Sequence, residues 1–314
     1  MISAAHFNVE RRNMWQPLTG KMIRILWTQK QDAGPGARGY AAMAYDSNRG
    51  RTVLFGGSGS LADTWEWDGE NWTQMADSGP PGRFQAAMAY DAQRNQTVLF
   101  GGTHGKADTW GWDGRNWTQL ADSGAWPRVA FAMAYDSKRQ QIVMFGGGPV
   151  GVTNPVGADT WEWNGATWTQ LAVTGPPTRV AHVMAYDSTR DRTVLFGGFG
   201  QTNAPLGDTW EWNGSEWTRV SDFGPTPCWH ASLTFKGDSV ALFGGTDSTT
   251  INKVYGTTWT WDGRNWTLRQ DFGPSPRAMA NMCYDSKRGR LVLYGGCVNQ
   301  TTAVDDTWEH SEGP

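Results

Sequence analysis

Short apolar stretches alternate with polar turns along the whole chain, and the same order of stretches returns six times. The clearest marker is a Gly-Gly pair that ends an apolar run, as in Thr-Val-Leu-Phe-Gly-Gly at residues 52–57. The pairs are Gly56-Gly57, Gly101-Gly102, Gly146-Gly147, Gly197-Gly198, Gly244-Gly245 and Gly295-Gly296. Their spacing of 45 to 51 residues indicates a repeat architecture, because a period of this length is typical of stacked or radially arranged units.

Each repeat is predicted to contain four short strands. Equivalents of residues 88–90 alternate in polarity like a first strand, and a polar turn then leads into the apolar run before Gly-Gly. A third strand begins at a Thr-Trp pair such as residues 64–65. Asp-Gly or Asn-Gly follows in five repeats, as at residues 68–69, and this pair favours a tight hairpin. The fourth strand therefore begins at the next tryptophan, Trp72 in the first repeat.

The last repeat lacks a fourth strand, because the chain ends soon after the third strand at Trp308. Residues 27–29, Trp-Thr-Gln, supply the missing pattern, and the 11 residues from this tryptophan to Arg38 match the distance in the other repeats. We therefore predict an all-β, six-bladed β-propeller of four-stranded antiparallel blades, closed by an N-terminal strand that completes the C-terminal blade. Residues 1–21 are predicted to be an N-terminal extension, and residues 22–314 a single propeller.

The repeat resembles the kelch repeat in three features: the Gly-Gly pair that closes the second strand, the tyrosine before the first turn, and the tryptophan that follows the pair. The resemblance covers about residues 22–310 and implies a six-bladed propeller. It leaves the function open, because kelch-like propellers include protein-interaction scaffolds, a copper oxidase, sugar-acid epimerases and plant proteins that redirect thiohydrolysis products. The residues that depart from the repeat are therefore the ones to search for a site.

Composition narrows the class of protein. The 314 residues include 40 glycines and 20 tryptophans, while 18% are charged, which argues against helical bundles. The mean hydropathy is −0.55, and no apolar run reaches the length that a membrane helix needs. A net charge of −3 without charge blocks predicts neither a nucleic-acid nor a membrane partner. Three cysteines and the lack of a signal-peptide pattern predict a cytoplasmic protein, and we expect a monomer.

Eighteen of the twenty tryptophans fit the repeat or the N-terminal segment, and we expect these to pack between sheets. Trp126 and Trp229 depart from it. Both lie in connections between blades, which open on the same edge as the loops after Gly-Gly; we call this edge the loop face. Because binding residues collect in loops on a rigid scaffold, we predict that both contact a ligand. The alternative is that they anchor their loops.

An arginine precedes the first strand in five repeats, and Cys228 replaces it in the fifth. The five are Arg38, Arg83, Arg128, Arg179 and Arg277. A ring of arginines would form an anion site, and Arg128 and Arg179 are the candidates for ligand binding. The alternative, which we favour, is a structural tie between blades or to loop carbonyls. An aspartate before Thr-Trp, as at Asp63, also recurs in five repeats and is expected to cap the strand entry.

Two histidines are placed near the mouth of the channel, where most repeats have alanine and one has Phe131. His182 and His230 are our candidate catalytic pair, because imidazole titrates near neutral pH and acts as acid, base or metal ligand. His104, in the loop after the second Gly-Gly pair, and Cys228 map to the same face. Together these four residues are a candidate set for a divalent metal such as zinc; the alternative is isolated polar residues in a pocket.

Two functions remain open, since no complete catalytic motif is present. The first is a kelch-type propeller that binds a small polar ligand or a peptide at the channel mouth and loop face. Asp247 and Asp305, in long loops of the last two repeats, join Trp126, Phe131 and Trp229 as candidate ligand contacts. The alternative is a metal- or histidine-assisted hydrolase or lyase that acts on an ester-like or sugar-derived substrate in the same pocket. Convergence of the histidines would favour the enzyme.

Overall fold

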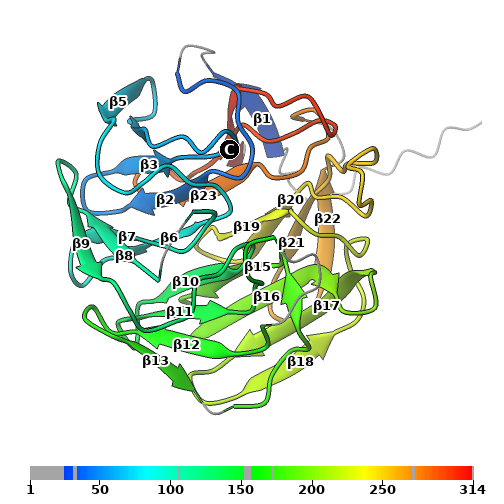
Figure 1. Ribbon diagram of the computed structural model, residues 1–314. Coiled ribbons are helices and arrows are strands. Elements are labelled where there is room, and N and C mark those ends of the chain that lie inside the picture. The colour runs from blue at the N-terminus through cyan, green and yellow to red at the C-terminus, as the bar shows by residue number, and fades with distance from the viewer. Residues whose placement is uncertain are drawn as a thin grey trace, which may run out of the picture.

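The apolar runs of the repeat form β-strands that surround a central channel. The computed structural model describes residues 25–30, 34–104, 107–151, 157–171, 173–270 and 273–312. Within these ranges the chain forms 25 strands in six antiparallel sheets and no helix. Figure 1 shows the sheets arranged as blades around one axis. The predicted all-β, six-bladed propeller is confirmed.

The strands run outward from the channel in chain order in blades 1 to 5, whereas in blade 6 the outermost strand is β1. Blade 1 contains β2 (Ala42–Asp46), β3 (Arg51–Phe55), β4 (Thr64–Trp67) and β5 (Trp72–Ala76). Blade 2 contains β6 (Ala87–Asp91), β7 (Gln96–Phe100), β8 (Thr109–Trp112) and β9 (Trp117–Ala121). Blade 3 contains β10 (Ala132–Asp136), β11 (Gln141–Phe145), β12 (Thr160–Trp163) and β13 (Trp168–Leu171).

The other three blades follow the same plan. Blade 4 contains β15 (Val183–Asp187), β16 (Arg192–Gly200), β17 (Pro205–Trp212) and β18 (Trp217–Ser221), and the short β14 (Arg179–Val180) pairs with β16. Blade 5 contains β19 (Ser232–Phe235), β20 (Val240–Phe243), β21 (Thr258–Trp261) and β22 (Trp266–Gln270). Blade 6 contains β23 (Asn281–Asp285), β24 (Arg290–Tyr294), β25 (Thr307–Glu312) and β1 (Ile25–Gln29).

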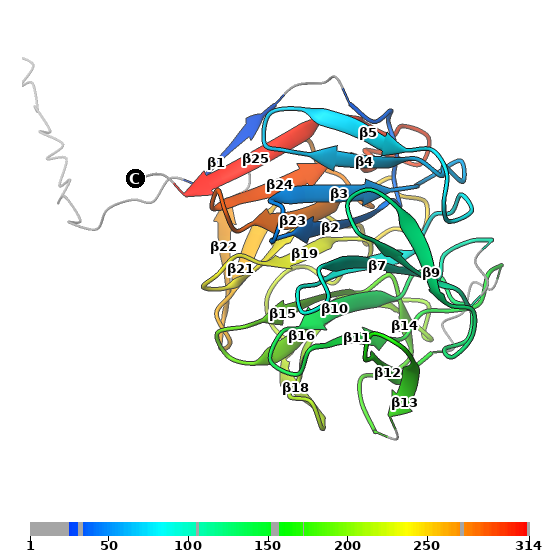
Figure 2. The ribbon, with the colours of Figure 1, turned by 90° about the vertical axis from the view of Figure 1, so that its left-hand side faces the viewer.

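Strand β1 closes the ring, as predicted. It lies antiparallel to β25 with Trp27 opposite His310, and Figure 2 shows the two strands side by side. The Trp27 indole nitrogen donates to the Thr258 hydroxyl at 3.1 Å, and its ring packs against Phe243 of blade 5. The first and last parts of the chain are therefore held in one blade. The predicted extension, residues 1–21, lies outside the described residues.

Tryptophans fill the interfaces between blades. The second tryptophan of the third strand is the largest fully buried side chain in five blades: Trp67, Trp112, Trp163, Trp212 and Trp261. Trp67 also donates its indole hydrogen to Glu309 of the preceding blade at 3.1 Å. Truncating a buried tryptophan to alanine costs roughly 3–5 kcal/mol. The repeated tryptophans therefore stabilise the ring, as the sequence predicted.

The Gly-Gly pair recurs because the next blade approaches it closely. Gly56 has φ +67°, and a Cβ atom built there would lie 2.5 Å from the carbonyl oxygen of Arg83. Gly57 donates its N–H to the same oxygen at 3.0 Å. A side chain at Gly56 would both strain the backbone and separate the blades.

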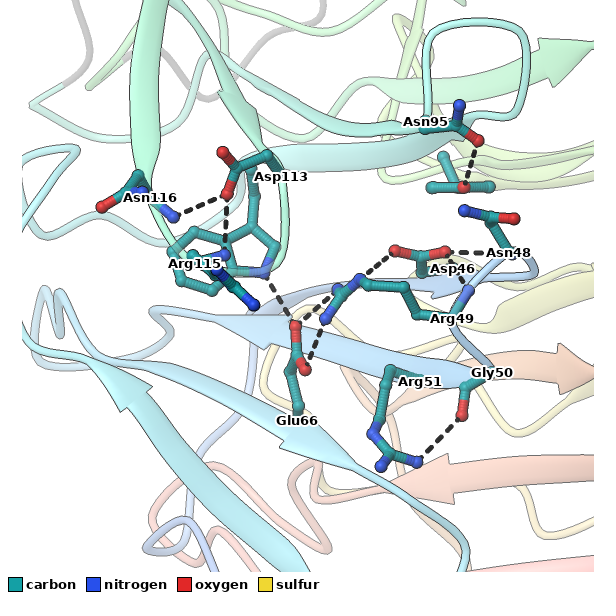
Figure 3. Close-up of polar contacts among 12 residues, drawn as sticks. Asp46, Asn48, Arg49, Gly50, Arg51, Glu66, Asn95, Asp113, Arg115 and Asn116 are labelled. Atoms are coloured by element: carbon teal, nitrogen blue, oxygen red, sulfur yellow. Dashed lines mark hydrogen bonds and ion pairs between the residues drawn. The ribbon is translucent and has the colours of Figure 1, made fainter.

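The edge opposite the loop face, which we call the turn face, carries ion pairs. Figure 3 shows the Arg49 guanidinium between the carboxylates of Asp46 and Glu66, with N–O distances of 2.6 Å to each. An equivalent Asp–Arg pair recurs in four more blades: Asp91–Arg94, Asp136–Arg139, Asp187–Arg190 and Asp285–Arg288. Blade 5 has Lys236 in place of the aspartate. The Asp–Arg pair is therefore present in every blade except the fifth, where Lys236 pairs with Asp238 at 2.5 Å instead.

Candidate functional site

The repeated arginines are buried and tie each blade together. Arg83 is 1% exposed and binds both carboxylate oxygens of Asp108 at 2.8 and 2.9 Å, with a third bond to the Gly101 carbonyl oxygen at 3.1 Å. The same pairing joins Arg38 to Asp63, Arg128 to Asp159, Arg179 to Asp208 and Arg277 to Asp306. Arg128 and Arg179, the candidates for ligand binding, are each buried and already paired, which favours the structural tie that the sequence analysis preferred.

The aspartates are ion-pair partners rather than simple strand caps. Burial alone would raise the pKa of Asp108, but hydrogen bonds from Arg83 and from the Trp110 indole lower it below its ordinary value. The carboxylate thus stays charged beside the guanidinium. A buried pair of this kind is costly to break, because the remaining charge has no partner and little water.

Blade 5 has neither the arginine nor the aspartate of this pair. Cys228 stands in place of the arginine and Thr257 in place of the aspartate. Cys228 is 3% exposed, and burial, with a smaller contribution from Asp247, raises the pKa of its thiol to about 12. The thiolate is the form that attacks substrates and binds metals. Cys228 is therefore a protonated, unreactive thiol at neutral pH.

A ring of peptide groups surrounds the channel at the loop face. One residue per blade adopts a left-handed conformation with φ between 53° and 59°: Tyr40, Gln85, Ala130, Ala181, His230 and Met279. Each of these residues donates its N–H to the carbonyl oxygen of its counterpart in the preceding blade, at 2.6 to 3.2 Å. Tyr40 donates to Met279, so the six hydrogen bonds form a closed circle. Sequence analysis missed this ring because its residue types share no pattern.

The ring encloses a small pocket at the channel mouth, which we call the mouth pocket. Its volume is about 140 Å³, and His182, His230, Phe131, Tyr40 and Asn281 are among the residues that line it. None of its lining residues is Asp, Glu, Lys or Arg. A second cavity of about 590 Å³ lies along the innermost strands and shares His182 and Phe131 with it. The structure thus brings both candidate catalytic histidines and Phe131 to one neutral pocket.

Five aromatic side chains form a continuous series of ring contacts at the mouth, which we call the aromatic arc. The series runs Phe84–Tyr40, Tyr40–His230, His230–Trp229 and Trp229–Phe199, with ring centroids 6.0, 5.0, 4.5 and 5.0 Å apart. The indole nitrogen of Trp229 is buried and has no hydrogen-bond partner among the described residues. A buried donor of this kind costs free energy unless a ligand or water pairs with it.

His182 is enclosed by the interface between blades 3 and 4. It is 3% exposed, its ring meets Phe145 edge-on at 5.6 Å, and neither ring nitrogen has a partner among the described residues. Burial, followed by the charge of Arg179, lowers its pKa to about 3. Burial also lowers the pKa of His230 to about 3, although part of its surface remains accessible at the mouth. Both imidazoles are neutral at neutral pH.

We expect acid to destabilise the fold through His182 well above the carboxylate range. An unfolded chain protonates this histidine near its ordinary pKa of 6.5, whereas the folded protein does so only near pH 3. The unfolding free energy therefore falls as the pH drops below 6.5, by about 2 kcal/mol at about pH 5. His182→Phe, which copies Phe131 of blade 3, should reduce this dependence and leave the part that comes from His230, whose pKa burial also lowers to about 3. Melting temperatures at about pH 7.5 and pH 5 test this; equal losses in both proteins would contradict it.

The predicted metal set is not assembled. Within the described ranges, no group of three or more His, Cys, Asp or Glu side chains is placed to hold a metal ion. His104 lies exposed in its own loop, and Cys228 is a buried thiol. Of the predicted divalent-metal set of His104, His182, His230 and Cys228, only His182 and His230 share a pocket, so the described geometry gives the metal site no support. Their catalytic role stays a prediction.

Trp126 has the contacts of a loop anchor. Its indole nitrogen donates to Asp159 at 2.9 Å, and its ring lies 3.8 Å from the Arg128 guanidinium carbon. Asp247 accepts a hydrogen bond from the Tyr255 hydroxyl at 2.6 Å and pairs with an exposed lysine of its own loop, while Asp305 is exposed. Neither carboxylate lines the mouth pocket. Of the two tryptophans that depart from the repeat, Trp229 is the one at the mouth.

A closed propeller of six four-stranded blades, each with a Gly-Gly pair after its second strand, is the architecture of a kelch-type protein. The family model described as "KLHDC2/KLHL20/DRC7 Kelch-repeats domain" matches residues 138–309, more than half of the chain. The chain belongs to this kelch-repeat family.

Comparison with solved structures supports the same fold. The "Structure of YjhT" aligns with a TM-score of 0.70 at 14% sequence identity, over 87% of this chain and 95% of the other. At this identity the similarity concerns the fold alone. Among curated protein sequences, none matches this chain. No helix long and apolar enough to cross a membrane occurs in the described part of the chain.

Proposed function

We propose that this propeller binds a small polar ligand or a peptide at the channel mouth. One uncharged group of the ligand enters the mouth pocket, and the rest lies over the aromatic arc. The observation that carries the proposal is the buried, unpartnered indole N–H of Trp229 in the middle of a series of aromatic rings. A ligand carbonyl or hydroxyl oxygen would accept that hydrogen while its apolar part packs on the rings.

The size and charge of the mouth define the group that enters. A volume of about 140 Å³ is below the range of pockets that enclose a whole drug-sized molecule, and suits one amino-acid side chain or a molecule of similar size. The lining carries no charged residue, and the two histidines are neutral. An ionised group would lose its hydration there without gaining a partner.

Blade 5 supports this location, because departures from the repeat gather in it. It lacks the Arg–Asp pair of the other blades, and it supplies Trp229 and His230 at adjacent positions. Residues that recur in every blade maintain the ring. Positions at which one blade differs from the repeat can instead carry a specific binding site. The hydrolase or lyase alternative gains no support, since its metal set is not assembled and its histidines are poor bases.

Location and partners follow from the same features. Cys228, Cys283 and Cys297 are free thiols, which fits the cytoplasm predicted from the sequence. The neutral mouth gives no reason to propose a nucleic acid or an anionic membrane as partner. A monomer suffices for the proposed site, because a single chain supplies the whole arc.

Trp229→Ala is expected to weaken ligand binding at least tenfold, because losing a central aromatic contact costs about 2 kcal/mol. Neutral polar fragments, screened by ligand-observed NMR, and a phage-displayed peptide library are the probes. Trp126→Ala is the matched control, since Trp126 lies in an equivalent connection but is paired with Asp159. If the ligands found bind Trp229→Ala as tightly as the native protein, the mouth is not the site.

A further inference from the structure

The outer rim between blades 4 and 5 carries an aromatic side chain where blades 1 to 3 have small polar ones; in the sequence, blade 5 has Phe272 at the same position. The residue before the glycine that follows the fourth strand is exposed in blades 1 to 3, where it is Ser78, Ser123 or Thr174. In blade 4 this residue is Phe223, which is 85% exposed. An aromatic ring in water contributes little to folding, and an exposed apolar patch that contains it, here with Val220 and Leu268, is typical of a contact surface.

Phe223 is presented on a fixed turn. The Ser221 hydroxyl donates to the Phe223 carbonyl oxygen at 2.9 Å and accepts from the Phe223 N–H at 3.1 Å. The next residue, Gly224, has φ +147° and lies against Trp266 of blade 5, so closely that a Cβ atom would be 2.5 Å from the Trp266 ring. A side chain held in place before binding loses less conformational entropy on binding.

A groove lies beside this turn. Its volume is about 560 Å³; Val220 and Phe223 line it from blade 4, and Trp266 and Arg264 from blade 5. Leu268, two residues after Trp266 and thus on the same side of β22, is 46% exposed. The equivalent position is glutamine in blades 1 to 3, at residues 74, 119 and 170. Phe223 thus replaces a polar residue on the blade 4 wall, and Leu268 adds an exposed apolar side chain on the neighbouring strand of blade 5; we call the groove of about 560 Å³ the rim groove.

The rim groove has an excess of positive charge. Arg219 lines it and forms an exposed ion pair with Asp222. Arg264 also lines it and forms no ion pair with any described residue. A ligand that places a carboxylate near Arg264 would complement this charge. The groove also lies between β18 and β22, the outer strands of their sheets, whose free edges accept an added extended segment.

We propose that the rim groove is a docking site for an extended segment of a partner protein that carries a carboxylate beside a large apolar side chain. The carboxylate pairs with Arg264, and the apolar side chain packs against Phe223 and Val220, which line the groove. A second copy of this chain fits less well, because a two-fold contact of the groove with itself brings like charges together. The site is separate from the channel mouth and does not depend on the function proposed for it.

The test is selection of a phage-displayed peptide library on the native protein, after removal of phage that bind Phe223→Ser, which copies blades 1 and 2. We expect enrichment of Asp or Glu next to Phe, Leu or Trp. A synthetic peptide of the enriched sequence should bind at least tenfold more weakly to Phe223→Ser and to Arg264→Glu. Arg115→Glu is the matched control, since Arg115 holds the equivalent position in blade 2, and it should bind normally, as should Trp229→Ala.

Several results would overturn the proposal. These are a lack of enrichment, enrichment of peptides without carboxylates, and equal binding to Phe223→Ser and the native protein. Concentration-dependent self-association of the native protein that Phe223→Ser abolishes would instead identify a second copy as the occupant. Melting temperatures of the variants within about 2 °C of the native value confirm that any lost binding reflects the groove and not the fold.

Discussion

Deletion of residues 22–30 is expected to abolish cooperative unfolding, or to lower the melting temperature by about 10 °C or more. The deletion removes β1 and exposes the backbone edge of β25, which pairs with it over five residues. It also removes Trp27, whose ring packs against blade 5; losing one such ring costs roughly 3–5 kcal/mol, a large share of the typical 5–15 kcal/mol of a folded protein.

Thermal unfolding followed by circular dichroism is the measurement. Deletion of residues 1–14 is the control, because it shortens the same end of the chain and leaves β1 intact; we expect its melting temperature to be unchanged. An unchanged melting temperature after deletion of 22–30 would disprove closure of the ring by this strand.

Arg83→Ala is expected to lower the unfolding free energy by about 3–5 kcal/mol. The substitution leaves the Asp108 carboxylate buried without its cation, and the Gly101 carbonyl oxygen without its donor. The pKa of Asp108, which the pair holds below its ordinary value, should rise in the variant. Because burial alone raises that pKa above the ordinary carboxyl value, stability should fall as the pH rises from the ordinary value to the new one, and then level off, since the charged form is the costly one.

Blade 5 provides the control for this prediction. Arg83→Cys combined with Asp108→Thr copies the pair found at residues 228 and 257 and removes both charges together. We expect the double variant to be more stable than Arg83→Ala by about 2 kcal/mol, since no unpaired charge remains. Urea unfolding of the three proteins measures the difference. If the double variant is the less stable one, the pair is not the source of the effect.

The architecture could be predicted from the sequence because every part of it is periodic. Glycine pairs, tryptophan pairs and Asp-Gly turns return at a spacing close to one blade, and each marks a local requirement: close approach, a buried ring or a tight hairpin. The missing fourth strand of the last repeat and the extra one around Trp27 predicted how the ring closes. The favoured role of the arginines also followed from repetition, since a residue needed in every blade serves the blade.

The candidate site was predicted only in part. Trp229, His182 and His230 were singled out because they break the repeat, and the structure places all three at the channel mouth. Tyr40 and Phe84 of the aromatic arc were missed, because each lies in a variable connection and no spacing links it to blade 5. Only two members of the predicted metal set, His182 and His230, share a pocket, because residues on one face of a ring need not meet.

A local pattern thus determines the strands, turns and blade order of this protein, because each depends on residues close together in the chain. The tertiary structure alone decides which side chains from different blades come together. The circle of peptide hydrogen bonds, the neutral mouth pocket and the rim groove between blades 4 and 5 each join residues from separate repeats. Their distances are set by the closure and packing of the whole ring, which no single repeat contains.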